Sequence, residues 1–311
     1  MKSLSQAVDD YLALRRNFGF KLREAEACLH KFVVFLKKNG SSHITHKLAL
    51  EFATLRQDQK PQSWSRQLLM IRGFARYRAG VDPKTEIPPG RLLPSRSQRA
   101  RPYLYTQSEI RQLLEAARKW KSPHPLQPRT YYCVFGLLAV SGMRVGEAIN
   151  LQPEDVDWSA GVLTIRGAKF GKSRHIPLHS STKAMLRKYA EQRDALYPRH
   201  PGTYFFVTSR GTKLDNVNLW GVFRALTRQI GICPPGVRHG PRLHDLRHRF
   251  AVETLLRWYR QEEDVTQRLP VLATYLGHAN VTATYWYLSQ TPQLMAAARK
   301  RLETRWKGVV R

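Results

Sequence analysis

Cysteine is scarce in this chain. Three cysteines occur among 311 residues, and Cys28, Cys133 and Cys233 lie far apart, so that no Cys-x-x-Cys pair exists. The sequence therefore supports neither a disulfide framework nor a zinc site built from cysteines. We expect each thiol to lie in a core, in a reducing cytosol.

Long apolar stretches are also missing. The N-terminal residues MKSLSQAVDD lack the apolar segment that a secretory signal requires. The longest mostly apolar run, Tyr131–Met143, is too short to span a bilayer. No segment opposes a Lys/Arg face to a strongly apolar one, as a membrane-surface helix would. The sequence thus predicts no membrane partner and a cytoplasmic, nucleoid-associated protein.

Acidic residues are few relative to basic ones. The chain has 23 Asp and Glu against 52 Lys and Arg, a formal net charge of +29 at pH 7. The excess is spread, because residues 1–100 carry 19 basic and 8 acidic residues and residues 101–311 carry 33 and 15. Both halves are expected to face the same polyanion, and double-stranded DNA is the leading candidate. A ribosomal protein would carry a similar charge, so only the sequence motifs can distinguish the two classes of protein.

The hydrophobic pattern divides the chain into four parts. Residues 1–82 carry apolar residues at helical spacing, which predicts a four-helix domain. A basic segment with five prolines at 83–103 predicts an extended linker. Residues 104–290 are predicted to be mostly helical, with strands at 162–165 and 175–178, and residues 291–311 to form a terminal amphipathic helix. The expected fold class is mainly α with a small antiparallel β-sheet.

The fourth helix of the first domain, expected over residues 63–79, is rich in arginine. Its apolar side leaves Arg66, Arg72, Arg76 and Arg78 on the remaining surface. Guanidinium groups on such a helix can pair with phosphates and base edges. We therefore predict DNA contacts through Arg66, Arg72 and Arg76, against the alternative of a solvated basic face.

Two segments of the second domain place cations where a phosphate could be held. Arg144 follows a Ser-Gly break and precedes Glu147 by three residues, so a carboxylate could fix its guanidinium as a clamp. The predicted hairpin carries Lys169, Lys172 and Arg174, which suit a DNA groove, and a lysine there could protonate a leaving oxygen. Taken singly, the two segments also fit an ordinary Arg–Glu pair and a basic surface hairpin.

Two further segments combine histidine with groups for phosphoryl chemistry. His244 and Arg247 lie three residues apart, on one helical face. His278 is followed seven and nine residues later by Tyr285 and Tyr287, and a tyrosine phenolate can attack phosphorus to form a phosphotyrosine. No convergent set of carboxylates or thiols accompanies the histidines, so no metal site is expected.

In this order, the segments resemble the tyrosine recombinase, or phage integrase, family over residues 104–290. The family pattern has an Arg in Gly-x-Arg-x-x-Glu, a Lys on a β-hairpin, His-x-x-Arg, Leu-Gly-His, and a Tyr nine residues after that His. The positions that match are Arg144, Lys169, His244, Arg247, His278 and Tyr287. Lys169 is preferred to Lys172 because it lies eight residues before Pro177, and Tyr285 is two residues off the family spacing.

The resemblance implies a two-domain DNA clamp, in which a helical core-binding domain precedes the catalytic domain. Tyr287 would attack the scissile phosphate and leave a 3′-phosphotyrosyl link and a free 5′-hydroxyl. Arg144 and Arg247 would hold the non-bridging oxygens, where negative charge builds up in the transition state. No metal, ATP or other cofactor is implied.

The remaining site residues follow from the same resemblance. His278 would hydrogen-bond the phosphate, His244 would assist proton transfer from the tyrosine, and Lys169 would protonate the departing 5′-oxygen. Glu147 and Asp245 are expected to orient the arginines and histidines, as carboxylates do around catalytic groups.

The resemblance also implies partners. We expect an inverted-repeat core site in DNA, a homotetramer assembled on it through an exchanged C-terminal helix, and an accessory recombinase or DNA-bending protein. No further domain precedes the helical region, which favours a compact Xer-like, Cre-like or transposon-borne enzyme for integration, excision, transposition or resolution. The alternatives are a type IB topoisomerase-like relaxase and a DNA-binding regulator on an idle recombinase fold.

Overall fold

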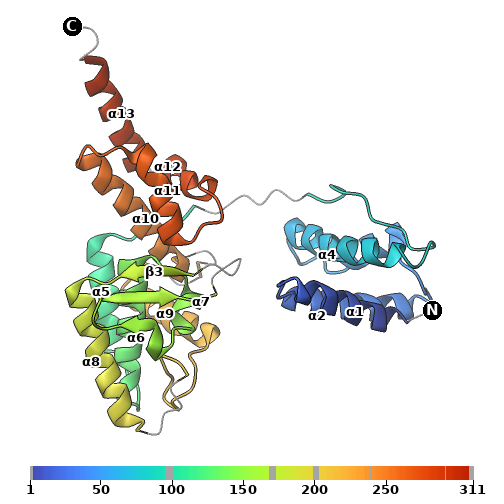
Figure 1. Cartoon of the computed structure of the whole chain (residues 1–311), viewed down its shortest axis with the longest axis horizontal. Coiled ribbons are helices and arrows are strands. Elements are labelled where there is room, and N and C mark those ends of the chain that lie inside the picture. Colours follow the sequence, from blue (N-terminus) through green and yellow to red (C-terminus); the bar gives the residue numbers. More distant parts are fainter. Residues whose placement is uncertain are drawn as a thin grey trace. The chain divides into compact units, whose positions relative to one another are not determined.

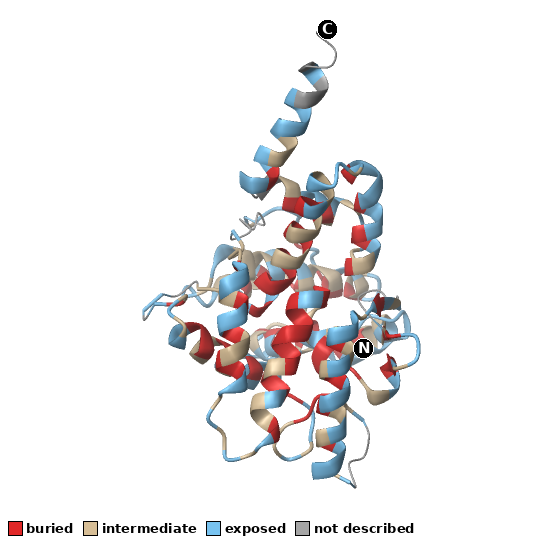
Figure 2. Cartoon of the chain, turned by 90° about the vertical axis from the view of Figure 1, so that its left-hand side faces the viewer, coloured by how far each residue is buried: buried red, intermediate tan, exposed pale blue. Residues whose placement is uncertain are grey.

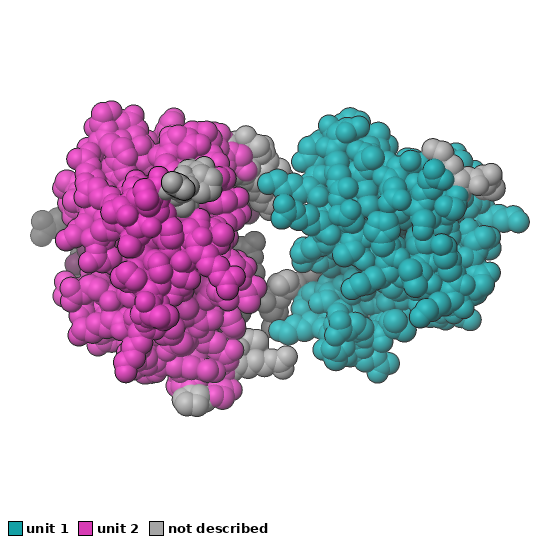
Figure 3. Space-filling view, turned by 90° about the horizontal axis from the view of Figure 1, so that it is seen from below, with its two compact units in different colours: residues 1–100 teal, residues 101–311 magenta. Residues whose placement is uncertain are grey.

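The computed structural model describes residues 3–94, 101–167, 173–198, 203–234, 236–237, 240–290 and 292–307. They belong to two compact units, Met1–Ala100 and Arg101–Arg311 (Figure 3). The described residues are mainly helical with one small antiparallel sheet, so the predicted fold class is confirmed (Figure 1). Within these residues, no helix is long and apolar enough to cross a membrane.

The described residues of the first unit form four helices, α1 (Leu4–Asn17), α2 (Arg23–Lys38), α3 (His46–Thr54) and α4 (Pro61–Ala79). The hydroxyl groups of Ser3 and Thr45 accept hydrogen bonds from backbone amides at the start of α1 and α3, and Pro61 opens α4 with its fixed φ. Both α2 and α3 pack against α4. The core between them is built from side chains such as Phe32 and Phe74, which are fully buried.

The chain after α4 folds back onto this unit instead of leaving it as a linker. Asp82 is buried and accepts a hydrogen bond from the hydroxyl of Thr85 at 3.1 Å, and the amide of Glu86 donates to the carbonyl of Ile44 at 2.8 Å. Arg78, expected on the surface, is only 5% exposed and lies with its Nε 3.6 Å from Asp82. The predicted linker over residues 83–103 therefore begins too early, because a turn around Asp82 holds the first of these residues in place.

The second unit begins with α5 (Gln107–Arg118), which a capping box formed by Thr106 and Glu109 opens. The buried helix α6 (Leu126–Ser141) and the short α7 (Val145–Ile149) follow, then a 3-10 turn at Pro153–Asp155. The sheet has the order β1 (Val156–Asp157), β2 (Val162–Ile165) and β3 (Arg174–Pro177), all antiparallel. Strand β1 was not predicted from the sequence, because two residues are too short to give a periodic signal. Helices α8 (Ser180–Leu196) and α9 (Asn216–Gln229) complete this part.

The part of the second unit that the structure describes ends with four helices: α10 (Leu243–Arg260), α11 (Val265–Leu276), α12 (Thr282–Gln290) and α13 (Pro292–Lys307). Helix α10 packs against α6, α11, α12 and α13, and α11 also contacts β3. This packing brings the start of α7, the second turn of α10 and the turn between α11 and α12 together. Helix α13 extends from the body of the unit, and exposed residues dominate it (Figure 2).

Candidate active site

The end of helix α6 positions Arg144, the first residue of the site. Helix α6 stops at Gly142, which has φ of +60° in the left-handed region. A Cβ there would lie 2.4 Å from the ring of Phe250, so only glycine fits. The chain then turns so that Arg144 caps the start of α7 and points its side chain toward the end of α11.

Arg144 is held by a carboxylate and a carbonyl. Its Nη1 donates to Oε1 of Glu147 at 2.8 Å, and its Nη2 donates to the carbonyl of Gly277 at 2.7 Å. Glu147 also accepts from the backbone amide of Arg144 at 2.8 Å. The guanidinium remains 28% exposed, so an anion can still reach it.

Arg247 lies deeper, on the buried face of α10. It is 2% exposed, and its two terminal nitrogens donate to the carbonyls of Gly142 at 2.8 Å and Leu276 at 2.5 Å. Burial and the neighbouring charge of Arg144 lower the pKa of Arg247 to about 10, so it stays protonated at neutral pH. Arg247 and Arg144 thus donate hydrogen bonds to the carbonyls of two consecutive residues, Leu276 and Gly277.

His278 and Tyr287 follow on the same stretch of chain. Nδ1 of His278 lies 2.8 Å from the hydroxyl of Thr284, which is fully buried. The rings of His278 and Tyr287 are stacked, with centroids 6.1 Å apart. Tyr287 is 3% exposed, whereas Tyr285 is 48% exposed. The structure thus stacks Tyr287 on the histidine and leaves Tyr285 exposed to solvent.

The second histidine lies on α10. The ring of His244 packs edge-on against His248, 4.8 Å between centroids, and His248 in turn contacts Tyr287 at 5.4 Å. Partial desolvation and the charge of Arg247 lower the pKa of His244. Burial, Arg247 and Arg144 lower the pKa of His278 to about 4. Both imidazoles are therefore neutral at pH 7, beside fixed positive charge.

Arg174 does not lie where we predicted it. It was expected to face DNA, but its side chain is 9% exposed, and both terminal nitrogens donate to the carboxylate of Glu147 at 2.9 and 2.7 Å. Its Nε donates to the carbonyl of Tyr275 at 2.7 Å. The side chain turns inward because Glu147, itself 10% exposed, would otherwise be a buried carboxylate with one cation. Burial raises the pKa of Glu147, but the hydrogen bonds and positive charge of Arg174 and Arg144 together outweigh this effect and lower the pKa to about 2.

Asp245 also acts differently from its predicted role. Its carboxylate accepts from the backbone amide of Arg242 at 2.9 Å and from the guanidinium of the same residue at 2.8 Å. It thus closes the first turn of α10, as acidic residues near a helix N-terminus do. Lys169 and Lys172 lie outside the described residues.

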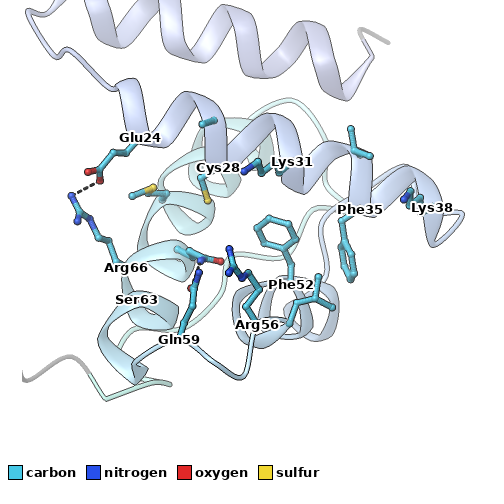
Figure 4. A pocket seen from close by; sticks show the side chains of 15 residues that line it. Glu24, Cys28, Lys31, Phe35, Lys38, Phe52, Arg56, Gln59, Ser63 and Arg66 are labelled. Atoms are coloured by element: carbon cyan, nitrogen blue, oxygen red, sulfur yellow. Dashed lines mark hydrogen bonds and ion pairs between the residues drawn. The ribbon is translucent and has the colours of Figure 1, made fainter. Parts of the chain in front are cut away.

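The arginines predicted to contact DNA in the first unit differ in their surroundings. Arg76 is exposed, and Nη1 of Arg72 lies 3.5 Å from the carbonyl of Pro89. Arg66 forms an ion pair with Glu24 across a cavity of about 670 Å³ between α2 and the start of α4 (Figure 4). Cys28 also lines this cavity, and burial raises the pKa of its thiol to about 11.

Two residues of the site, Thr284 and Gly277, were not predicted from the sequence, and the role of Arg174 was predicted wrongly. Thr284 fixes the ring of His278, Gly277 supplies a carbonyl to Arg144, and Arg174 pairs with Glu147. The first two lie inside segments that we singled out, but their partners come from other elements. The described residues contain no group of three or more His, Cys, Asp or Glu side chains that could hold a metal ion.

These features define a class of protein. Two arginines, two neutral histidines and a buried tyrosine converge in a helical unit of a strongly basic chain, as a site for phosphoryl transfer on a polyanion requires. The phage integrase family model matches residues 104–293, more than half of the chain. The chain therefore belongs to the phage integrase family of tyrosine recombinases, and its function is site-specific recombination of DNA.

Individual relatives agree with this assignment. The protein y4rB of Sinorhizobium fredii, whose name places it among integrases and recombinases, is 50% identical over 99% of this chain and 99% of its own. The tyrosine recombinase XerA of Thermococcus kodakarensis is 27% identical over 87% of this chain and 79% of its own. A crystal structure of XerH recombinase bound to palindromic difH substrate has a TM-score of 0.65 at 20% identity, over 89% of this chain and 78% of that one. The last likeness shows the shared fold.

Proposed function

We propose that this recombinase cuts and rejoins DNA by attack of Tyr287 on a scissile phosphate held by Arg144 and Arg247. The phenolic oxygen forms a bond to phosphorus and the 5′-oxygen leaves, so that a 3′-phosphotyrosyl link and a free 5′-hydroxyl result. Attack by the 5′-hydroxyl of a partner strand reverses the step and releases the tyrosine. The energy of the broken phosphodiester is kept in the phosphotyrosine.

One observation carries this proposal: Arg144, Arg247, His278 and Tyr287 come from three helices and one turn, yet share a single neighbourhood. Guanidinium groups held by carbonyls and a carboxylate keep donors free for phosphate oxygens without reorganising during the reaction. Such pre-positioned cations stabilise the charge that develops on the non-bridging oxygens.

The two histidines and Lys169 donate hydrogen bonds and transfer protons. A neutral His278, with Nδ1 directed at Thr284, can donate from Nε2 to the phosphate. His244, on the solvent side of the site, can take the proton of the tyrosine. Lys169 would supply a proton to the departing 5′-oxygen. Fixed arginines replace the divalent cation of other phosphoryl transfers, so neither metal nor ATP takes part.

We also propose that four copies assemble on an inverted-repeat core site and that α13 docks on a neighbouring copy. Most of α13 is solvent-exposed, including Met295, Leu302 and Trp306. Exposed apolar side chains on a projecting helix favour an intermolecular contact. An accessory recombinase or DNA-bending protein would act on this assembly.

The proposal can be tested by covalent trapping. Purified protein is mixed with nicked duplexes of random core sequence, in EDTA and without ATP, and quenched in SDS. Protein–DNA adducts are recovered, the DNA is sequenced and the modified peptide is mapped. We expect an adduct at Tyr287 that Tyr287→Phe abolishes and the matched control Tyr285→Phe retains.

Other outcomes separate the alternatives. An adduct at Tyr285, or one that needs a divalent cation, contradicts the mechanism. Relaxation of supercoiled plasmid without strand exchange would indicate a topoisomerase-like relaxase. Tight specific binding with no adduct would indicate a regulator on the same fold.

A further inference from the structure

Three arginines from three elements share the C-terminal end of α11. The carbonyl of Tyr275 accepts from Nε of Arg174 at 2.7 Å. The next two carbonyls, of Leu276 and Gly277, accept from Arg247 and Arg144 at 2.5 and 2.7 Å. The last carbonyls of a helix lack intrahelical partners and carry the negative end of its dipole, so cations are favourable there.

The arginines divide between two environments. Arg144 and Arg247 are the proposed phosphate ligands. Arg174 has each of its three nitrogens engaged inward, one by the carbonyl of Tyr275 and two by Glu147. Its guanidinium is nine-tenths buried, which leaves it unable to bind DNA without breaking these contacts.

Glu147 is the point at which Arg174 meets Arg144. Oε1 accepts from Nη1 of both arginines, at 2.8 Å from Arg144 and 2.9 Å from Arg174. Oε2 accepts from Nη2 of Arg174 at 2.7 Å and from the backbone amide of Arg144 at 2.8 Å. The bidentate interaction with Arg174 therefore occupies Oε2, the oxygen through which Glu147 could form a second hydrogen bond to the guanidinium of Arg144.

We infer that Arg174 is a positioning residue, which binds Glu147 bidentately and so keeps Arg144 from being neutralised by that carboxylate. Without Arg174, Glu147 would form a one-to-one pair with Arg144 and draw it from the phosphate. This inference rests on the proposed function, because Arg144 must be the phosphate ligand for its charge to matter. It assigns Arg174 to the rate of cleavage and not to affinity for DNA.

The experiment uses the full chain and a nicked duplex that gives the wild-type adduct. For Arg174→Gln, Arg174→Lys, Glu147→Gln and the double variant Arg174→Gln/Glu147→Gln, three quantities are measured: the adduct rate at saturating DNA, the Kd as a function of salt, and the Tm. The matched control is Arg118→Gln, which breaks the Arg118–Glu115 pair of 2.9 Å on α5, away from the site.

We expect Arg174→Gln to slow adduct formation about tenfold or more at saturating DNA, since small misplacements of a catalytic group are costly. Its Kd and salt dependence should match those of the control. The double variant should be faster than Arg174→Gln alone, because the carboxylate that would capture Arg144 is then neutral. Arg174→Lys, which keeps the charge, should recover part of the rate and separates this effect from a folding defect.

Three outcomes overturn the inference. A salt slope lower by about one with a normal saturating rate would mean that Arg174 contacts DNA. If the double variant forms the adduct no faster than Arg174→Gln alone, Arg174 contributes only to packing. If the Arg174 variants match Arg118→Gln in adduct rate, Kd and Tm, Arg174 has no role in the reaction. A wild-type protein that forms no adduct on any duplex would instead overturn the proposed chemistry, and the role of Arg174 with it.

Discussion

The carbonyl of Gly277 accepts a hydrogen bond from Nη2 of Arg144 at 2.7 Å, which ties the end of α11 to the start of α7. Gly277 has φ of +65°, and a Cβ there would lie 2.9 Å from Nη1 of Arg174 and 3.3 Å from Nη1 of Arg144. The residue thus needs the left-handed conformation and leaves room for two guanidinium groups.

We therefore expect Gly277→Ala to impair catalysis beyond its effect on stability. The strained conformation should cost about 1–2 kcal/mol, and displacement of Arg144 should slow adduct formation roughly 100-fold. Gly231→Ala is the matched control, since Gly231 has φ of +77° after α9 and nothing within 4 Å of the added Cβ. It should lose similar stability in urea unfolding and keep the cleavage rate. Equal rates for the two variants would contradict this account.

The pKa of His278 gives a prediction for pH. Burial, Arg247 and Arg144 lower it from 6.5 to about 4, so the unfolded chain takes up this proton before the folded one does. The free energy of unfolding should therefore fall as the pH drops from 6.5 toward 4. NMR of the DNA-free protein should find the imidazole titrating near pH 4. Arg144→Gln should raise that pKa, and His278→Asn should reduce the loss of stability in acid. Titration near 6.5 would be incompatible with the geometry.

The helical pattern predicted most of the helices and strands, and the motif spacing predicted which residues meet in the site. Helices and strands follow from local periodicity and caps, as the Thr106–Glu109 capping box illustrates. The direction of single arginines could not be read in this way. Arg174 was expected at a DNA surface, and its burial depends on Glu147 and on the carbonyl of Tyr275, far away in the chain. Only tertiary packing decides which cation a buried carboxylate takes.

Arg76 and Arg78 test the same distinction in the first unit. Arg76 is exposed on α4, so Arg76→Gln should lower the slope of log Kd against log salt by about one and leave stability unchanged.

Arg78 is buried beside Asp82, so Arg78→Gln should lower the free energy of unfolding by about 3 kcal/mol, because that carboxylate loses its cation. Fluorescence anisotropy with a labelled duplex and urea unfolding measure the two effects. A reduced salt slope for Arg78→Gln with normal stability would place that side chain on DNA.

Helix α13 offers the corresponding test of assembly. Leu294, in its first turn, is buried against α10, whereas Leu302 and Trp306 are 58% and 70% exposed. Leu294→Ala should therefore destabilise the second unit by about 3 kcal/mol. The double variant Leu302→Ala/Trp306→Ala should change stability by less than about 0.5 kcal/mol and keep adduct formation on a single half-site. If these side chains dock on a neighbour, light scattering with a Holliday junction should find four copies for wild type and fewer for the double variant. A tetramer that survives the double variant would show that the docking contact does not depend on Leu302 and Trp306.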